Sequence, residues 1–239
     1  MRFNPTKCTV LRIAPTRSSK KVIDASYTLH GHTLETEGAR KYLGVTITSN
    51  LSWNTHIENT AGKGNKTIGF IRRNLKDCTK PVREASYTSM VRPILEYSST
   101  VWDPHTTANI NLLEQVQRRA ARYVCNDYTS RTPGCVTSMM DALEWESLHE
   151  RRKKNRLCML YKINNALVDI KKDDYLKTSD ARTRGDHNFF QDRTYSENYR
   201  QSFFPRTIRD WNQLPIAITT ASSYSSFRSS LDTPRLVGY

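Results

Sequence analysis

Residues 41–57 read KYLGVTITSNLSWNTHI, and within this stretch the hydrophobic period changes from that of a strand to that of a helix. Leu43, Val45 and Ile47 alternate with other residues, which is typical of a half-buried strand over 42–47. From Thr55 onward the apolar and small residues fall at steps of four and three, on one face of a helix: Ile57, Ala61, Gly64, Ile68, Ile71 and Leu75. We therefore expect a short strand followed by a long amphipathic helix.

The rest of the chain extends this pattern in both directions. Upstream, residues 8–13 and 27–34 are predicted strands, the first ending before Pro15 and the second turning at Gly31. Downstream, helices are predicted from Thr79, from Thr106 or Thr107, and over 139–167 with a break near Trp145. The fold class is α+β, a short N-terminal antiparallel β segment followed by a mainly α-helical domain.

Side chains are assigned to the buried faces by the same spacing. Pro93 is expected to kink or end the helix that begins near Thr79. The predicted inward positions of that helix are Val82, Ala85, Val91 and Ile94. In the helix over 139–167 they are Leu148, Leu157, Leu160, Tyr161 and Leu167.

Composition divides the chain into four parts. Residues 1–54 hold the predicted strands and 55–170 the helical domain, whereas 171–200 lose their large aliphatic residues and are expected to form a polar linker. Residues 201–239 regain helical spacing through Phe204, Ile208 and Trp211, which predicts a C-terminal extension with short helices.

The net charge of the chain indicates which class of partner it binds. Lysine and arginine total 37 against 23 aspartates and glutamates, a net charge of +14, with an isoelectric point near 9.7. Such a charge attracts polyanions through the summed field and counterion release. We expect nucleic acid as the partner rather than a membrane surface, and a merely soluble basic protein is the alternative.

The sequence gives little support for a metal site or a membrane-spanning segment. The five cysteines lack the Cys-x-x-Cys spacing of zinc sites, and the six histidines do not complete one. No run of 18 apolar residues exists. We expect an intracellular protein of the nucleus or cytoplasm, with reduced thiols and no bound metal.

Several segments, in their order along the chain, resemble one enzyme family. These segments are FNPTKC at 3–8, YLGV at 42–45, SWNTHI at 52–57, GFIRRNL at 69–75, VRPILEY at 91–97, VWDP at 101–104, LEQVQRRAAR at 113–122, LEWESLHERR at 143–152 and RTIRDWNQLP at 206–215. Together they span nearly the whole chain, and their order resembles that in the reverse transcriptases of non-LTR, jockey-like retrotransposons.

The resemblance implies the rear part of a polymerase. Residues 1–54 are then a remnant of the palm, and 55–170 are a thumb-like domain. The primer grip is assigned to Tyr42, Leu43, Gly44 and Val45, where Gly44 permits close backbone approach unless it is an ordinary strand glycine. Lys7 matches a lysine beside the leaving pyrophosphate, the alternative being a solvated lysine.

No catalytic residue is assigned in this chain. Phosphoryl transfer in the family needs two metal ions held by aspartates, and the adjacent pair Asp173-Asp174 follows Lys171-Lys172 without a strand. Mg²⁺ is therefore expected only in the intact polymerase, together with its palm and fingers. This chain alone is predicted to be inactive as an RNA-directed DNA polymerase and to contribute primer–template binding.

Nucleic-acid contacts are assigned to basic clusters on the predicted helices. The competing interpretation is a solvated face paired with Glu114, Glu146 and Glu150. The assigned residues are Arg72, Arg73, Arg118, Arg119, Arg122, Arg151, Arg152, Lys153, Lys154 and Arg156. Two other functions stay open: a stand-alone basic helical module that binds nucleic acid, and an inert product of a degenerate element copy.

Overall fold

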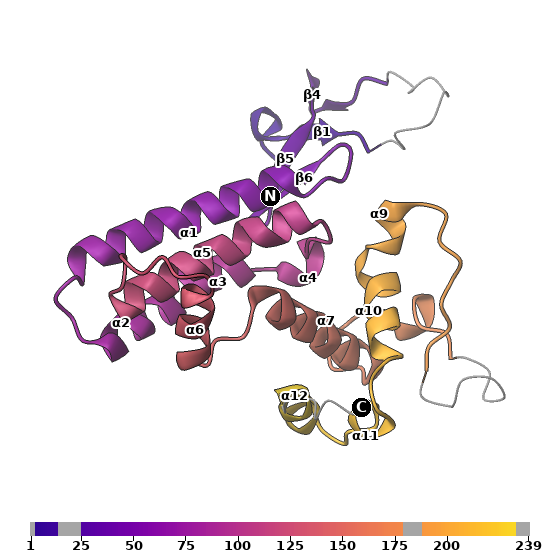
Figure 1. The fold of residues 1–239 in the computed structure, drawn as a ribbon. Coiled ribbons are helices and arrows are strands. Elements are labelled where there is room, and N and C mark those ends of the chain that lie inside the picture. The colour runs from indigo at the N-terminus through magenta and orange to yellow at the C-terminus, as the bar shows by residue number, and fades with distance from the viewer. Residues whose placement is uncertain (1–2, 14–24, 179–187, 233–239) are drawn as a thin grey trace. The chain divides into compact units, whose positions relative to one another are not determined.

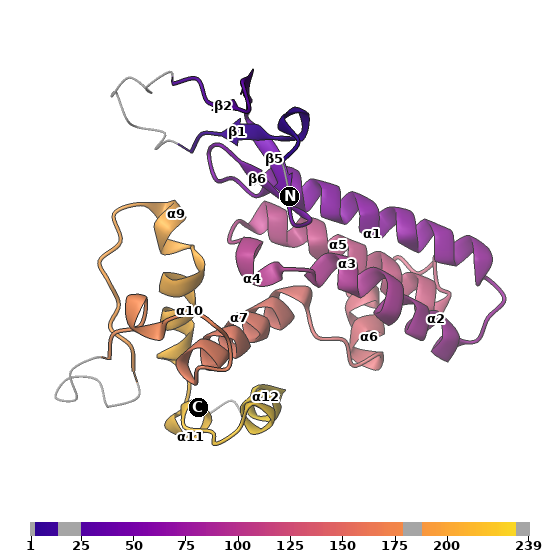
Figure 2. The ribbon, with the colours of Figure 1, turned by 180° about the vertical axis from the view of Figure 1, so that it is seen from behind.

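The protein is described by a computed structural model over residues 3–13, 25–178 and 188–232 (Figures 1 and 2). The chain divides into two compact units, 1–63 and 64–239. The α+β class is confirmed, with short strands at the N-terminus followed by helices. The division falls inside the first helix, after the boundary expected at 54. Pro15, expected to end the first strand, lies outside the described residues.

The strands of the first unit form three two-stranded sheets. The hairpin expected around Gly31 is present, with His30 and Gly31 at φ 50° and 79°. Two pairs are antiparallel, as expected, and one is parallel: β2 (Thr28–Leu29) with β3 (His32–Thr33), β5 (Ala39–Tyr42) with β6 (Val45–Thr48), and, in parallel, β1 (Thr9–Leu11) with β4 (Glu35–Glu37). A 3₁₀ turn, η1 (Pro5–Lys7), precedes β1.

The prediction of one strand over 42–47 was wrong, because the chain reverses at Leu43-Gly44. Both residues have positive φ, 46° and 88°, as in the two-residue turn that matches the twist of a hairpin. Tyr42 pairs with Val45 across the turn. Leu43 is consequently 74% exposed, whereas Val45 is buried.

A histidine ties this hairpin to the first helix, α1 (Asn54–Asn74). The buried His56 accepts the backbone N–H of Thr46 at its Nδ1, 3.2 Å away. Burial lowers the pKa of His56, and the charges of Lys63 and Lys41 lower it further. The imidazole is therefore neutral at pH 7, as acceptance at Nδ1 requires.

Helices make up most of the second unit, and the predicted helix around Pro93 continues past that proline. Pro93 is the second residue of α3, which follows a π-helical turn; the wider turn accommodates the proline ring, which in a regular helix would clash with the carbonyl four residues earlier. The elements are α2 (Lys80–Ser86), the π turn η2 (Tyr87–Val91), α3 (Arg92–Glu96), α4 (Ser99–Trp102), α5 (Thr107–Cys125), α6 (Cys135–Ala142), α7 (Leu148–Asn164), η3 (Lys172–Asp174), α9 (Glu197–Arg200), α10 (Phe203–Trp211), α11 (Ile216–Thr219) and α12 (Tyr224–Asp232).

The buried side of α2 differs from the prediction. Val82 and Ala85 are exposed, whereas Tyr87 is fully buried and stacks on Trp145 with ring centroids 4.3 Å apart. Trp145 in turn donates its indole N–H to Glu84 at 3.0 Å. An aromatic contact across 58 positions of sequence therefore sets the face of this helix, which the local spacing did not indicate.

Close packing of α1 on its neighbours depends on Gly64. A Cβ placed there would lie 3.0 Å from side-chain atoms of both Leu95 and Val116. These two residues are fully buried, so the neighbours have little room to move. The second half of α1 runs alongside α5 as a result (Figures 1 and 2).

The C-terminal segments share a core with α7. Tyr161 of α7 stacks on Phe227 of α12, and Phe227 on Trp211 of α10, at centroid distances of 4.5 and 5.4 Å. Leu176 and Phe189, within the predicted polar linker, are buried in the same cluster. The expectation of a linker was thus wrong at these two residues, because isolated apolar side chains carry no periodic signal. Leu167, predicted inward, is exposed.

Candidate nucleic-acid interface

The ten basic residues predicted to bind nucleic acid have very different surroundings. Arg152 and Arg156 of α7 are 0% and 2% exposed. Each donates its Nε–H to one carboxylate oxygen of Asp103, both at 2.8 Å. Neither side chain is open to a phosphate, so their assignment as nucleic-acid contacts was wrong.

Asp103 is the centre of a buried ionic cluster. Arg206 of α10 contacts it as well, at 3.3 Å, and donates to the Asp103 carbonyl at 2.9 Å. Arg156 also forms an ion pair with Asp210, at 3.0 Å. Burial lowers the pKa of Arg206, with the Asp103 charge opposing it. One carboxylate therefore joins the segment after α4 to α7 and α10, which is a structural role.

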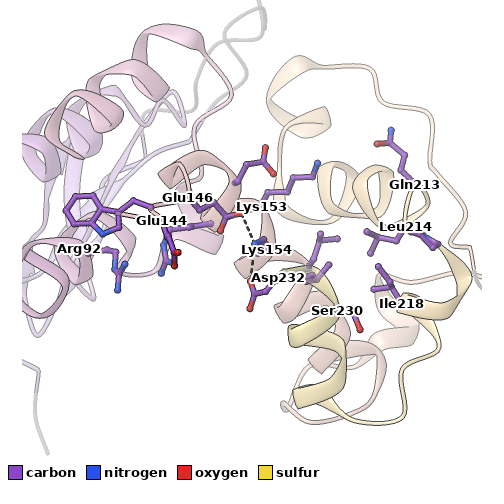
Figure 3. A pocket seen from close by; sticks show the side chains of 16 residues that line it. Arg92, Glu144, Glu146, Lys153, Lys154, Gln213, Leu214, Ile218, Ser230 and Asp232 are labelled. Carbon is purple, nitrogen blue, oxygen red and sulfur yellow. Dashed lines mark hydrogen bonds and ion pairs between the residues drawn. The ribbon is translucent and has the colours of Figure 1, made fainter. Parts of the chain in front are cut away.

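Two further cations of α7 are held by carboxylates at the surface. Arg151 pairs with Glu96, and that hydrogen bond raises the pKa of Arg151. Lys154 lies between Glu146 and Asp232, at 2.7 and 3.0 Å (Figure 3). The competing interpretation of a paired face is thus confirmed for Lys154 and Glu146.

Lys153 and Lys154 line the larger hollow, with a volume of about 1070 Å³. Four cations and four carboxylates line it: Arg92, Arg151, Lys153 and Lys154, with Glu144, Glu146, Glu150 and Asp232. The charges of the lining residues balance, so the lining itself does not concentrate positive charge for a polyanion.

Arg122 of α5 also has a structural role. Its guanidinium donates to the carbonyl oxygens of Asp127 and Ser130, at 3.2 and 3.0 Å. It thereby holds the loop after α5. The Asp127 carboxylate accepts hydrogen bonds from Ser130 and Thr129, which lower the pKa of Asp127 to about 2.

The remaining arginines are exposed on two neighbouring helices. Arg72 and Arg73 lie in the last turn of α1, and Arg118 and Arg119 lie in α5. Arg119 donates to the Asn65 side chain of α1 at 2.9 Å. Of the predicted residues, these four are therefore the arginines that the structure leaves exposed on α1 and α5, and their exposed faces are called the α1–α5 surface below.

A smaller hollow at the end of this surface adds residues that the sequence did not single out. It has a volume of about 400 Å³. Its lining is Arg72, Arg73, Lys76, Arg83, Tyr123, Asn126 and Tyr128. Lys76 follows Arg72-Arg73 closely in the sequence, and this proximity could have identified it as a further member of the basic cluster. Arg83 belongs to the next helix, α2, and Tyr128 to a distant segment, so only folding places these two side chains here.

In the first unit, the primer-grip residues occupy the tip of the β5–β6 hairpin. Tyr42 is 65% exposed and Leu43 more so, whereas Val45 is buried. Lys7 is exposed in η1, where its carbonyl accepts a hydrogen bond from Arg40 at 3.0 Å. The hairpin tip is thus accessible, as backbone approach to another molecule requires.

Comparisons with protein-family models, with curated proteins and with solved structures find no match to this chain. Within 3–13, 25–178 and 188–232, no group of three or more His, Cys, Asp and Glu side chains is arranged to hold a metal ion. No helix in the same ranges is long and apolar enough to cross a bilayer.

Proposed function

We propose that this chain is part of an RNA-directed DNA polymerase of a non-LTR retrotransposon and contributes primer–template binding. The ordered set of segments resembling that family supports the origin. The observation that carries the binding role is the exposed quartet Arg72, Arg73, Arg118 and Arg119 on adjacent helices. Polymerisation itself belongs to aspartates that we do not assign in this chain.

The quartet acts on the nucleic-acid backbone rather than on bases. Arginine presents a planar fork of donors that matches phosphate oxygens, and each neutralised phosphate releases condensed counterions. Together with Lys76 and Arg83, the surface offers six cations. Six contacts give a log–log salt dependence with a slope of about −5 on a duplex.

The hairpin tip has a different role in the proposal. With Tyr42 and Leu43 exposed beside Gly44, the turn presents backbone that a primer strand can approach. Lys7 keeps its proposed place near a leaving pyrophosphate only in the intact enzyme, with its palm, fingers and Mg²⁺.

A stand-alone binding module is the second candidate. The aromatic and aliphatic cluster around Trp211 and Phe227 gives the second unit a core of its own, as independent folding requires. This function uses the same basic surface and does not need the polymerase. An upstream open frame encoding the aspartates would favour the first candidate, and stop codons there would favour the second.

The test of binding removes two charges from the surface. Arg118→Gln with Arg119→Gln is expected to weaken binding of any duplex sequence and to reduce the salt slope by about 2, because about 0.9 is lost per phosphate contact. The measurement is fluorescence anisotropy of an RNA–DNA primer–template over a series of salt concentrations.

The matched control removes two charges elsewhere in the second unit, by Arg193→Gln with Arg200→Gln. Both side chains are exposed, outside the α1–α5 surface, and the slope is expected to stay unchanged. Equal losses in both pairs would show that net charge alone attracts the duplex. Absence of binding by the unmodified chain at low salt would refute the proposed function.

A further inference from the structure

The smaller hollow differs from the rest of the basic surface in being concave. Three elements build it: the end of α1 with Lys76, α2 through Arg83, and the end of α5 with Asn126 and Tyr128. Its volume, about 400 Å³, lies within the range of small-ligand sites. A hollow of this size is comparable with one nucleotide unit and is too small to enclose a duplex.

Its charge is unbalanced, in contrast to the larger hollow. Four cations and no carboxylate are among the lining residues. The neighbouring Asp77 lies 3.8 Å from Lys76, but both side chains are more than two-thirds exposed, where water and salt screen the pair. An internal phosphodiester carries one negative charge, whereas a phosphomonoester carries about −1.5 to −2 at pH 7. The concentration of cations therefore favours a phosphomonoester.

Arg83 supplies an unused donor. Its Nε is buried, and no acceptor among the described residues takes its hydrogen. Burying such a group without a partner costs free energy, so an incoming anion that accepts this hydrogen gains an advantage. Arg83 thus distinguishes the hollow from the open helix surface, where water satisfies the donors.

The two tyrosines differ in their availability. Tyr123 is buried, and its hydroxyl lies 3.2 Å from Ser86 Oγ, so it forms a wall. Tyr128 is exposed, and the Arg72 guanidinium lies 5.5 Å from its ring centroid. An exposed ring beside an arginine is suited to stacking on a base.

We propose that this hollow binds the terminal phosphomonoester of a single nucleic-acid strand, with the end base against Tyr128. The inference rests on the proposed function, because it names a specific part of the bound nucleic acid. Arg72, Arg73, Lys76 and Arg83 hold the phosphate, and Asn126 adds an amide at the rim.

The test compares two single strands of identical sequence, one with a 5′-phosphate and one with a 5′-hydroxyl, by fluorescence anisotropy with the full chain. A strand with a 3′-phosphate completes the set. At least one phosphorylated strand is expected to bind about 10-fold tighter or more than the hydroxyl strand. The phosphate accepts charge-assisted hydrogen bonds from the cations, and the hydroxyl end forms none of them. Arg83→Gln is expected to abolish this preference.

Two further variants separate binding from folding. Tyr128→Ala, at an exposed ring, is expected to reduce affinity for the phosphorylated strand without lowering the thermal midpoint. Arg131→Gln changes an exposed arginine that does not line the hollow and is expected to keep the preference.

The outcomes separate the two proposals. Equal affinity for phosphorylated and hydroxyl ends would overturn this inference and leave the proposed function standing. Absence of binding to any strand or duplex would overturn both. Competition by a free nucleoside monophosphate as strong as that of the phosphorylated strand would overturn the assignment to a strand end.

Discussion

Single side chains in this protein show how burial changes the meaning of a charge. Arg152 and Arg118 are both arginines on α-helices, but Arg152 is enclosed against Asp103 and Arg118 is exposed. Arg152 even has two guanidinium nitrogens without a partner among the described residues. Its charge is therefore held by Asp103 and is closed to phosphate.

Removing the Asp103 charge is expected to destabilise the second unit strongly. Asp103→Asn leaves Arg152, Arg156 and Arg206 buried without their shared carboxylate. Breaking a buried ion pair on one side costs about 3–5 kcal/mol, which corresponds to a fall of about 6–20 °C in the midpoint of a unit this size. Thermal unfolding followed by circular dichroism measures it.

An exposed ion pair provides the control for that substitution. Glu197 and Arg200 lie 2.6 Å apart, but both side chains are about half exposed. Glu197→Gln is expected to leave the midpoint nearly unchanged, since solvent screens such pairs. A similar fall in both variants would contradict the structural role given to Asp103.

At the scale of the helix, glycines of α1 have opposite effects according to their surroundings. Gly62, Gly64 and Gly69 each weaken the helix by about 1 kcal/mol relative to alanine. Only Gly64, of the three, would bring a Cβ to 3.0 Å from two buried side chains. Tertiary packing therefore explains Gly64 but not Gly62 or Gly69.

Substitution at two of these glycines tests the close packing of α1. Gly64→Ala gains helix propensity but overpacks the contact with Leu95 and Val116, at about 1–3 kcal/mol, so a net loss of stability is expected. Gly62→Ala meets no described atom within 4 Å and is expected to stabilise by about 1 kcal/mol. Urea denaturation measures both, and stabilisation by both would contradict the close contact.

Over the second unit as a whole, the aromatic cluster joins segments that composition separates. Trp211 is 1% exposed and contacts Phe189 and Phe227. Residues 201–232 therefore belong to the same core as α7 and are not an appended extension. Loss of one large side chain from the cluster is expected to weaken both parts together.

Trp211→Ala is expected to destabilise the second unit by about 3–5 kcal/mol, as for other buried aromatic residues. Amide exchange should then increase in α7 as well as in α10. Tyr195→Ala, at an 89% exposed ring, is the control and should change neither. Faster exchange confined to the C-terminal helices would show an independent extension.

The sequence by itself determined the α+β class, the positions of α1, α5 and α7 and the excess of positive charge, because these depend on local periodicity and composition. Only the tertiary structure decided which cations are exposed. The partners of Asp103 lie 49, 53 and 103 residues away, and Arg83 and Tyr128, which line one hollow, lie 45 residues apart in the sequence. Helical spacing assigns a residue to a face, but the charge that meets that face comes from elsewhere in the chain, so burial and pairing follow only from folding.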